Sequence, residues 1–109
     1  MKQPPVGPNI GAHMSIAGGL HLALERGAEV GCVSVGLFIK PSNQWKVKPL
    51  ADADVALFRA KRAELKVRHV VAHASYLVNL ASPDPALLEK SRVGFRIEME
   101  RCEAVGANY

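Results

Sequence analysis

Long hydrophobic runs and cysteine are both scarce in this sequence of 109 residues. Its longest apolar stretch, residues 33–39, is far shorter than the roughly 18 residues that a membrane span requires. Residues 1–5 carry no apolar signal segment, and the only two cysteines, Cys32 and Cys102, lie far apart in the chain. These features argue against a membrane protein and against a secreted disulfide scaffold. We therefore expect the protein in the reducing cytoplasm.

Several common catalytic motifs are also missing. The sequence contains no GxxxxGK[ST] phosphate loop, GxSxG nucleophile elbow, HExxH zinc helix or CxxC pair. Gly18 and Gly19 alone are weak evidence for phosphate binding. The function must therefore be sought in the fold and in scattered polar residues.

The composition is that of an ordinary globular chain. Hydrophobic residues make up 49% and charged residues 22%, which fits one domain at most. The formal charge of +4 agrees with a nucleic-acid partner but is too small to establish one.

Strand and helix patterns alternate along the chain. Short runs rich in β-branched residues predict strands covered on both faces, and apolar residues at helical spacing predict helices. Asp84, Pro85 and Gly106 supply the N-cap, first-turn proline and C-terminal stop of the last helix. The expected strands span residues 6–13, 32–39 and 67–72, and the expected helices span 20–30, 51–66 and 85–105.

This order predicts an α/β chain with a parallel sheet. Three strand–helix units of about 35 residues match the repeat of an eight-fold β/α (TIM) barrel, which needs roughly 250 residues. We therefore expect the βαβαβα N-terminal portion of such a barrel, truncated. Residues 1–109 would form one partial domain that ends at the start of a fourth strand near 107–109. A small open doubly wound sheet would normally add another strand and a recognisable ligand loop, and neither is visible.

The helical patterns also predict which faces are buried. One face of the third helix is expected to pack in the core, and the acidic residues of all three helices are expected to meet water or a basic partner. The expected core residues of the third helix are Leu88, Phe95, Met99 and Cys102, and the acidic residues concerned are Glu25, Glu64 and Glu98.

Four histidines are candidates for metal binding or catalysis. His69 and His73 are four positions apart, but in a strand that spacing spans about 13 Å, so the two cannot share one ion. In a barrel, His73 would lie at the carboxyl end of its strand, where active sites form, and His69 at the structural end. His13 ends the first strand equivalently, and His21 is expected to be a solvated or capping residue.

Two loops have compositions that suit contact with DNA. The loop 40–49 combines lysines with a tryptophan and two amides, which suits phosphate contact and base stacking, although a wet surface or a tryptophan packed on the second helix would also explain it. The loop 74–80 is unusually apolar, so its side chains either wedge into a duplex or lie under a neighbouring loop. The polar and aromatic residues of the first loop are Lys40, Asn43, Gln44, Trp45, Lys46 and Lys48.

Taken together, four segments resemble endonuclease IV, the zinc-dependent apurinic/apyrimidinic endonuclease family of DNA repair. They occur in one consistent order from about Ile10 to the end of the chain, and the resemblance covers only the N-terminal part of that family. The segments are 11–20 (GAHMSIAGGL), 37–45 with its Leu-Phe and Gln-Trp pairs, 73–80 (HASYLVNL), and 88–103.

The resemblance implies an eight-fold β/α barrel that holds three zinc ions. Such an enzyme cuts double-stranded DNA on the 5′ side of an abasic site and leaves a 3′-hydroxyl. His73 matches the first zinc-binding histidine, and His13 matches a histidine that lines the site. Tyr76 and Leu77 match residues that enter the minor groove, and the loop that holds Asn43 and Gln44 is implied to contact DNA.

This sequence departs from the family pattern at two of these positions. Asn43 stands where the family usually has an arginine that penetrates the duplex, so damage recognition is expected to change. Ala74 stands where an aspartate is common, so one group that could orient an imidazole or a water is missing.

The remaining zinc ligands of the family would lie beyond Tyr109. We therefore expect the isolated chain to hold no three-metal cluster, to be inactive and to self-associate, and the full-length protein to be monomeric. Two other interpretations stay open: a metal-dependent sugar isomerase or epimerase type of TIM barrel, and a non-catalytic nucleic-acid-binding module.

Overall fold

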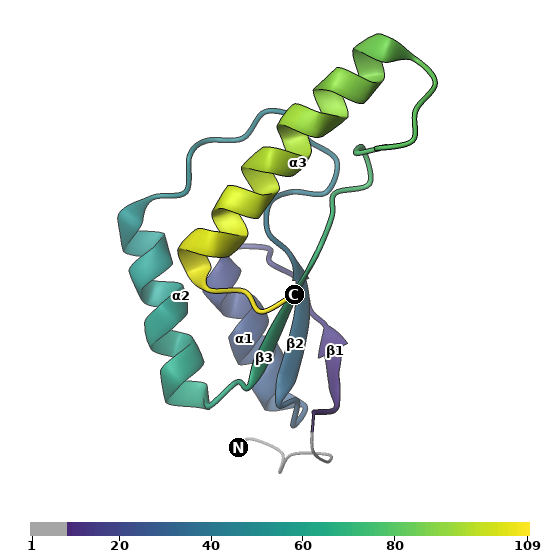
Figure 1. Cartoon of the computed structure of the whole chain (residues 1–109). Helices are drawn as coiled ribbons and strands as arrows, with labels where there is room; N and C mark the ends of the chain where they lie inside the picture. Colours follow the sequence, from purple (N-terminus) through teal and green to yellow (C-terminus); the bar gives the residue numbers. More distant parts are fainter. Residues whose placement is uncertain (1–8) are drawn as a thin grey trace.

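The computed structural model describes residues 9–109 and has the expected order of elements (Figure 1). Every element described lies within one or two residues of its predicted bounds, except the first strand. Of the rest of that predicted strand, residues 9 and 10 are described and are not in a strand, and residues 6–8 lie outside the described part of the chain. The elements are β1 (Gly11–His13), α1 (Leu20–Glu29), β2 (Ser34–Phe38), α2 (Asp52–Leu65), β3 (His69–His73) and α3 (Pro85–Val105).

The three strands form one parallel sheet in the order β1-β2-β3. Gly36 of β2 pairs with both His13 and Val71, and Phe38 pairs with His73. Because all three strands run the same way, their carboxyl ends meet at one edge of the sheet. This sheet, with a helix after each strand, is the βαβαβα portion of a β/α barrel that the sequence predicts.

In the described part of the chain, the helices cover only one face of the sheet. Val35, Leu37 and Val70 point to that face and are fully buried against Leu24 of α1 and Phe58 of α2. Their neighbours along each strand point to the opposite face, where Val71 is 42% exposed. An uncovered face of this kind is the one that lines the inside of a barrel.

The last residues of the chain lie along the free edge of β3 (Figure 1). Tyr109 pairs with Val71 as in a parallel ladder: its N–H donates to the Val70 carbonyl at 3.3 Å, and its carbonyl accepts from the Ala72 N–H at 2.7 Å. The side chain of Asn108 also accepts from the Val70 N–H (3.0 Å) and from the Arg62 guanidinium (2.6 Å).

Helix α3 begins and ends where the sequence predicts. Asp84 is its N-cap and accepts a hydrogen bond from the Ala86 N–H at 3.0 Å. Gly106 has a φ of 77°, a left-handed conformation that glycine adopts without strain, and its N–H donates to the last carbonyls of the helix. None of the helices in residues 9–109 combines the length and hydropathy needed to cross a membrane.

The predicted core face of α3 is wrong in part. Met99 is 55% exposed, and Leu88, Phe95 and Cys102 are only half-buried. α3 extends past the carboxyl ends of the strands, so most of its length faces the long loops after β2 and β3 rather than the apolar core (Figure 1). Backbone groups of those loops need polar partners, and this favours small and polar residues on the inner face of α3. The residues of α3 that are buried are Ser91, Gly94, Glu98 and Val105.

Two of the three acidic residues named above behave as predicted. Lys61 forms ion pairs with Glu25 (3.2 Å) and Glu64 (3.0 Å) on the outer surface of α1 and α2. The hydrogen bond to Glu64, and then the one to Glu25, raise the pKa of Lys61. The prediction for Glu98 is wrong, because this carboxylate is only 4% exposed.

Candidate metal and nucleic-acid site

Four rings gather at the carboxyl edge of the sheet. The Phe38 ring lies 4.7 Å from that of His13, 5.1 Å from that of His73 and 5.1 Å from that of Tyr76, measured between ring centroids. Each strand supplies one of the first three rings at its last residue, and the loop after β3 supplies the fourth. The structure therefore brings together three of the residues predicted to form the site.

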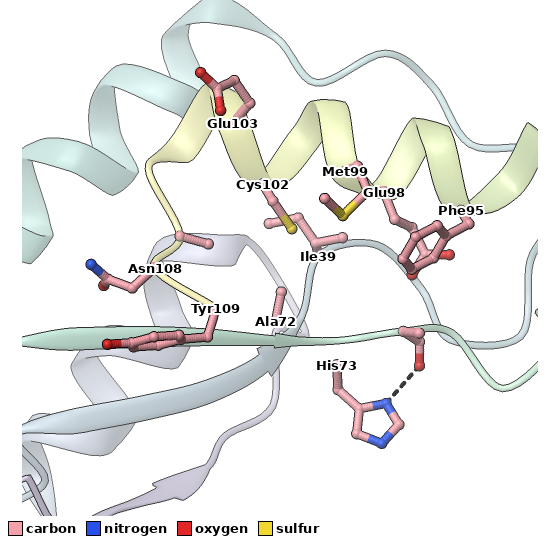
Figure 2. Close-up of a pocket in the computed structure, with 12 residues that line it drawn as sticks. Ile39, Ala72, His73, Phe95, Glu98, Met99, Cys102, Glu103, Asn108 and Tyr109 are labelled. Carbon is pink, nitrogen blue, oxygen red and sulfur yellow. Dashed lines mark hydrogen bonds between the residues drawn. The ribbon is translucent and has the colours of Figure 1, made fainter.

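His73 has one ring nitrogen committed and one free for a ligand. Its Nδ1 lies 2.6 Å from the carbonyl oxygen of Ala74 (Figure 2). Because a carbonyl can only accept, Nδ1 carries the proton, and the lone pair of Nε2 is left available. Metal-bound histidines are commonly held in this way, by a carbonyl or carboxylate on the other nitrogen. The sequence has alanine and not aspartate at position 74, so it lacks one side chain that could orient this imidazole. The backbone carbonyl of Ala74 orients it instead.

The donors present fit part of a metal site. The rings of His13 and His73 are 6.1 Å apart, but no group of three His, Cys, Asp or Glu side chains in residues 9–109 could hold a metal ion. Burial, and then the charge of Glu98, raise the pKa of the Cys102 thiol, which favours the form that does not bind metals. A catalytic zinc takes three protein ligands. His73 suits one of them, and the described residues supply no complete set of three.

The remaining two histidines lie away from this edge. His69 begins β3 at the opposite end of the strand, as predicted, where its Nδ1 is buried with no hydrogen-bond partner in the described structure. His21 is half-buried near the start of α1, next to Gly19.

The loop after β2 is only partly the wet cationic surface that its composition suggests. Lys40 is 1% exposed, and its Nζ donates to the Gln44 carbonyl at 2.5 Å. Lys46 and Lys48 are exposed, as are the predicted DNA-contacting residues Asn43 and Gln44. Lys40 is buried because the loop folds back over it and offers a carbonyl to its ammonium group.

Trp45 packs on α3. One interpretation of the sequence had placed it on the second helix, α2, and that interpretation is wrong. A Cβ built on Gly94 would lie 3.4 Å from the Trp45 ring, so the indole lies directly against the helix at this glycine. The ammonium group of Lys90 lies 4.7 Å from the centre of the ring. This packing removes one face of the indole from any role in base stacking.

The loop after β3 presents its tyrosine to solvent. Tyr76 is 73% exposed, whereas Leu77 is half-buried. The N–H of Tyr76 donates to the carbonyl of Ser42 at 3.0 Å, which ties this loop to the one that carries Asn43. The two predicted DNA-contacting loops therefore form one continuous surface beside His73.

Helix α3 anchors both loops through buried and half-buried polar side chains. The carboxylate of Glu98 accepts from the N–H of Ser75 (2.8 Å) and from its hydroxyl (3.1 Å). The hydroxyl of Ser91 accepts from the Asn79 N–H at 2.9 Å, and the Arg101 guanidinium donates to the Ile39 carbonyl at 2.8 Å. Burial lowers the pKa of Arg101, and Glu98 partly offsets this.

Sequence reasoning missed Glu98 because a charged residue in a helix is usually exposed. One signal was present: Ser91, Gly94 and Glu98 recur at helical spacing and share a face, and two of these residues are small. A face of small residues that also carries one carboxylate indicates close packing with a specific polar partner.

A groove of about 390 Å³ lies between α3, β3 and the C-terminal residues (Figure 2). Ile39, Ala72 and Cys102 contribute to its lining. His73 also borders it, but Figure 2 shows the imidazole on the opposite side of the sheet from α3. The groove is therefore separate from the ring cluster that could bind a metal.

These features define a piece of a β/α barrel with histidines at the carboxyl ends of its strands. A sequence profile of the xylose isomerase-like TIM barrel family matches residues 24–109, and the chain belongs to that family.

Its relatives have a more specific name within the family. The chain is 48% identical over 99 residues to a protein of Halorhodospira halophila named "Probable endonuclease 4", covering 91% of this chain and 33% of that protein. It is 46% identical over 97 residues to one of the same name from Geobacter sp. strain M21, covering 89% of this chain and 34% of the relative. These similarities confirm the resemblance to endonuclease IV and do not favour a sugar isomerase.

A solved structure agrees with this result. The crystal structure of endonuclease IV from Thermus thermophilus matches with a TM-score of 0.87 at 36% identity, covering 94% of this chain and 38% of that one. The chain thus spans about a third of the length of the curated relatives it matches.

Proposed function

We propose that this chain forms the N-terminal part of a DNA repair endonuclease of the endonuclease IV type. Its substrate is double-stranded DNA with an abasic site, and the reaction hydrolyses the phosphodiester on the 5′ side of that site and leaves a 3′-hydroxyl. The relatives named endonuclease 4 support this proposal. The observation that carries it is the orientation of His73, whose Nε2 is free at the barrel edge while Nδ1 is bound to a carbonyl.

In this proposal His73 is one ligand of a zinc site completed by donors from outside the 109 residues. Bound zinc would supply an activated water and would bear charge that develops on the phosphate. His73 would hold the metal at a fixed place, because its exposed ring lies against those of Phe38 and Tyr76 and its Nδ1 proton is engaged. His13 lines the same site without ligating.

The DNA-binding surface is the joined pair of loops after β2 and β3. Tyr76 stands out from this surface, and Asn43, Gln44 and Leu77 lie beside it in the same two loops. An exposed aromatic ring next to a metal site suits contact with the gap left by a missing base. The shorter side chain of Asn43 would fill that gap less well than an arginine.

A chimera tests the proposal directly. Residues 10–109 replace the matching part of the Thermus endonuclease IV, and the product is assayed on duplexes that differ only in one abasic site. We expect incision 5′ to that site, loss of activity after chelation and recovery with zinc. Incision of intact and abasic duplexes at equal rates contradicts the proposed substrate. Binding to DNA without incision supports the non-catalytic module instead.

Replacing Tyr76 by alanine in the chimera should weaken binding to abasic DNA. Contact between a base and an aromatic side chain contributes about 1–3 kcal/mol, which corresponds to an increase of about 5- to 150-fold in the dissociation constant. Fluorescence anisotropy with a labelled abasic duplex measures this constant. Tyr109→Ala is the control, because this second tyrosine lies against β3 near His69 and away from the two loops. Equal losses in the two variants would show that Tyr76 has no special role.

The isolated chain of 109 residues should be inactive and should self-associate. No three metal donors come together among the described residues, and one face of the sheet is uncovered there. Sedimentation velocity and an incision assay check both expectations, and a monomeric, active chain would contradict them.

Both cysteines are free, which supports our further proposal of a cytoplasmic location.

A further inference from the structure

We propose that Glu98 is a positioning residue that sets the orientation of His73 through the peptide bond between Ala74 and Ser75. The inference rests on the proposed role of His73 as a zinc ligand. Glu98 does not touch the ring, since it belongs to α3 and the imidazole lies across the sheet from that helix (Figure 2). The connection is made by two hydrogen bonds on opposite sides of one peptide group.

The first hydrogen bond fixes the plane of that peptide. The N–H of Ser75 donates to Oε1 of Glu98 at 2.8 Å, and the carboxylate is 4% exposed. Because a peptide group is planar and trans, the carbonyl of Ala74 must point the opposite way from this N–H. A hydrogen bond to Glu98 on α3 therefore directs the Ala74 carbonyl away from α3.

The second hydrogen bond uses that carbonyl. Its oxygen accepts the Nδ1 proton of His73 at 2.6 Å, so rotation of the peptide would lengthen both hydrogen bonds together. The negative charge of Glu98 also polarises the peptide and strengthens the acceptor at its far end. Glu98 thus favours the tautomer in which Nε2 is free to bind a metal.

The rest of the inner face of α3 supports this role. The hydroxyl of Ser75 donates to the second carboxylate oxygen at 3.1 Å, which fixes Glu98 itself in two places. Ser91, two turns earlier on the helix, holds the Asn79 N–H of the same loop. The carboxylate is therefore part of a rigid attachment and has little freedom to release the peptide.

The tautomer of His73 is the direct readout. The chain contains four histidines, so ¹⁵N-histidine labelling with single substitutions assigns each ring, at a pH well above the ordinary pKa of histidine. We expect the Nδ1–H form to dominate at His73 in the wild-type chain. Glu98→Leu keeps an apolar filling of similar size but offers no acceptor, and should shift the tautomer ratio toward Nε2–H by at least about threefold.

Two variants separate positioning from general loss of structure. Glu98→Gln keeps an acceptor for the Ser75 N–H and should retain a ratio close to that of the wild type. Ser75→Ala removes only the hydroxyl contact and should also retain it. If Glu98→Leu leaves the ratio unchanged, or if the wild-type ring is mainly Nε2–H, the proposal is wrong. The wild-type measurement decides even if the leucine variant fails to fold.

A second measurement tests the consequence for the metal. In the chimera with Thermus endonuclease IV, Glu98→Leu should lower zinc affinity by at least about tenfold, and Glu98→Gln by less. His73→Ala is measured alongside. Full zinc content in that variant would refute the proposed ligand role of His73, whereas the tautomer result in the metal-free chain would still decide the role of Glu98.

Discussion

Replacing His73 by alanine should lower the rate of incision at an abasic site by more than about 100-fold. Loss of a residue that is hydrogen-bonded to a metal ligand typically costs about 10- to 100-fold, and loss of the ligand itself should cost more. The imidazole is held at the strand end by its hydrogen bond to the Ala74 carbonyl, and alanine leaves no nitrogen at that place. The rate is measured on the chimera with saturating abasic duplex, together with the zinc content of the purified protein.

His69 supplies the matched control for this prediction. It lies in the same strand and on the same face of the sheet, but at the far end of β3. His69→Ala should therefore leave the incision rate within a few-fold of the parent. The ligand role of His73 would be refuted if its alanine variant kept its full zinc content.

Replacing Phe58 by alanine should remove much of the stability of the chain. Phe58 is fully buried where α2 meets the sheet, and truncation of a buried phenylalanine costs about 3–5 kcal/mol in the free energy of unfolding. Single domains have about 5–15 kcal/mol in total, so the variant should be partly unfolded at mild urea concentrations. Urea titration of a dilute chain, followed by Trp45 fluorescence, measures the change.

The adjacent residue tests whether burial is the cause. Leu57 precedes Phe58 on α2 but is 38% exposed, so Leu57→Ala should cost no more than about 1 kcal/mol. Alanine favours a helix more than leucine or phenylalanine does, so similar losses in the two variants would show that the burial of Phe58 is not the cause.

Most of the fold could be predicted because its signals are local. The caps of α3 depend on Asp84, Pro85 and Gly106 acting on their immediate neighbours, and the structure confirms each of them. The length of an extended strand separated His73 from His69, because four residues of strand span about 13 Å although both side chains face the same way, and this needs no knowledge of the neighbouring strands.

The candidate site could be predicted less fully. The resemblance to endonuclease IV identified Tyr76, and its exposure agrees with a surface role. The hydrogen bond that orients His73 could not be predicted, because its acceptor is a backbone carbonyl. Every residue has such a carbonyl, so the sequence does not indicate which one accepts.

The sequence by itself determined the order of strands and helices and the end of β3 at which each histidine lies, since local geometry and side-chain periodicity decide both. Only the tertiary structure decided that Glu98 and Lys40 are buried and that Trp45 packs on α3. Whether a charged group can be buried depends on finding hydrogen-bond partners, and here those partners are backbone groups of loops that the fold arranges around it.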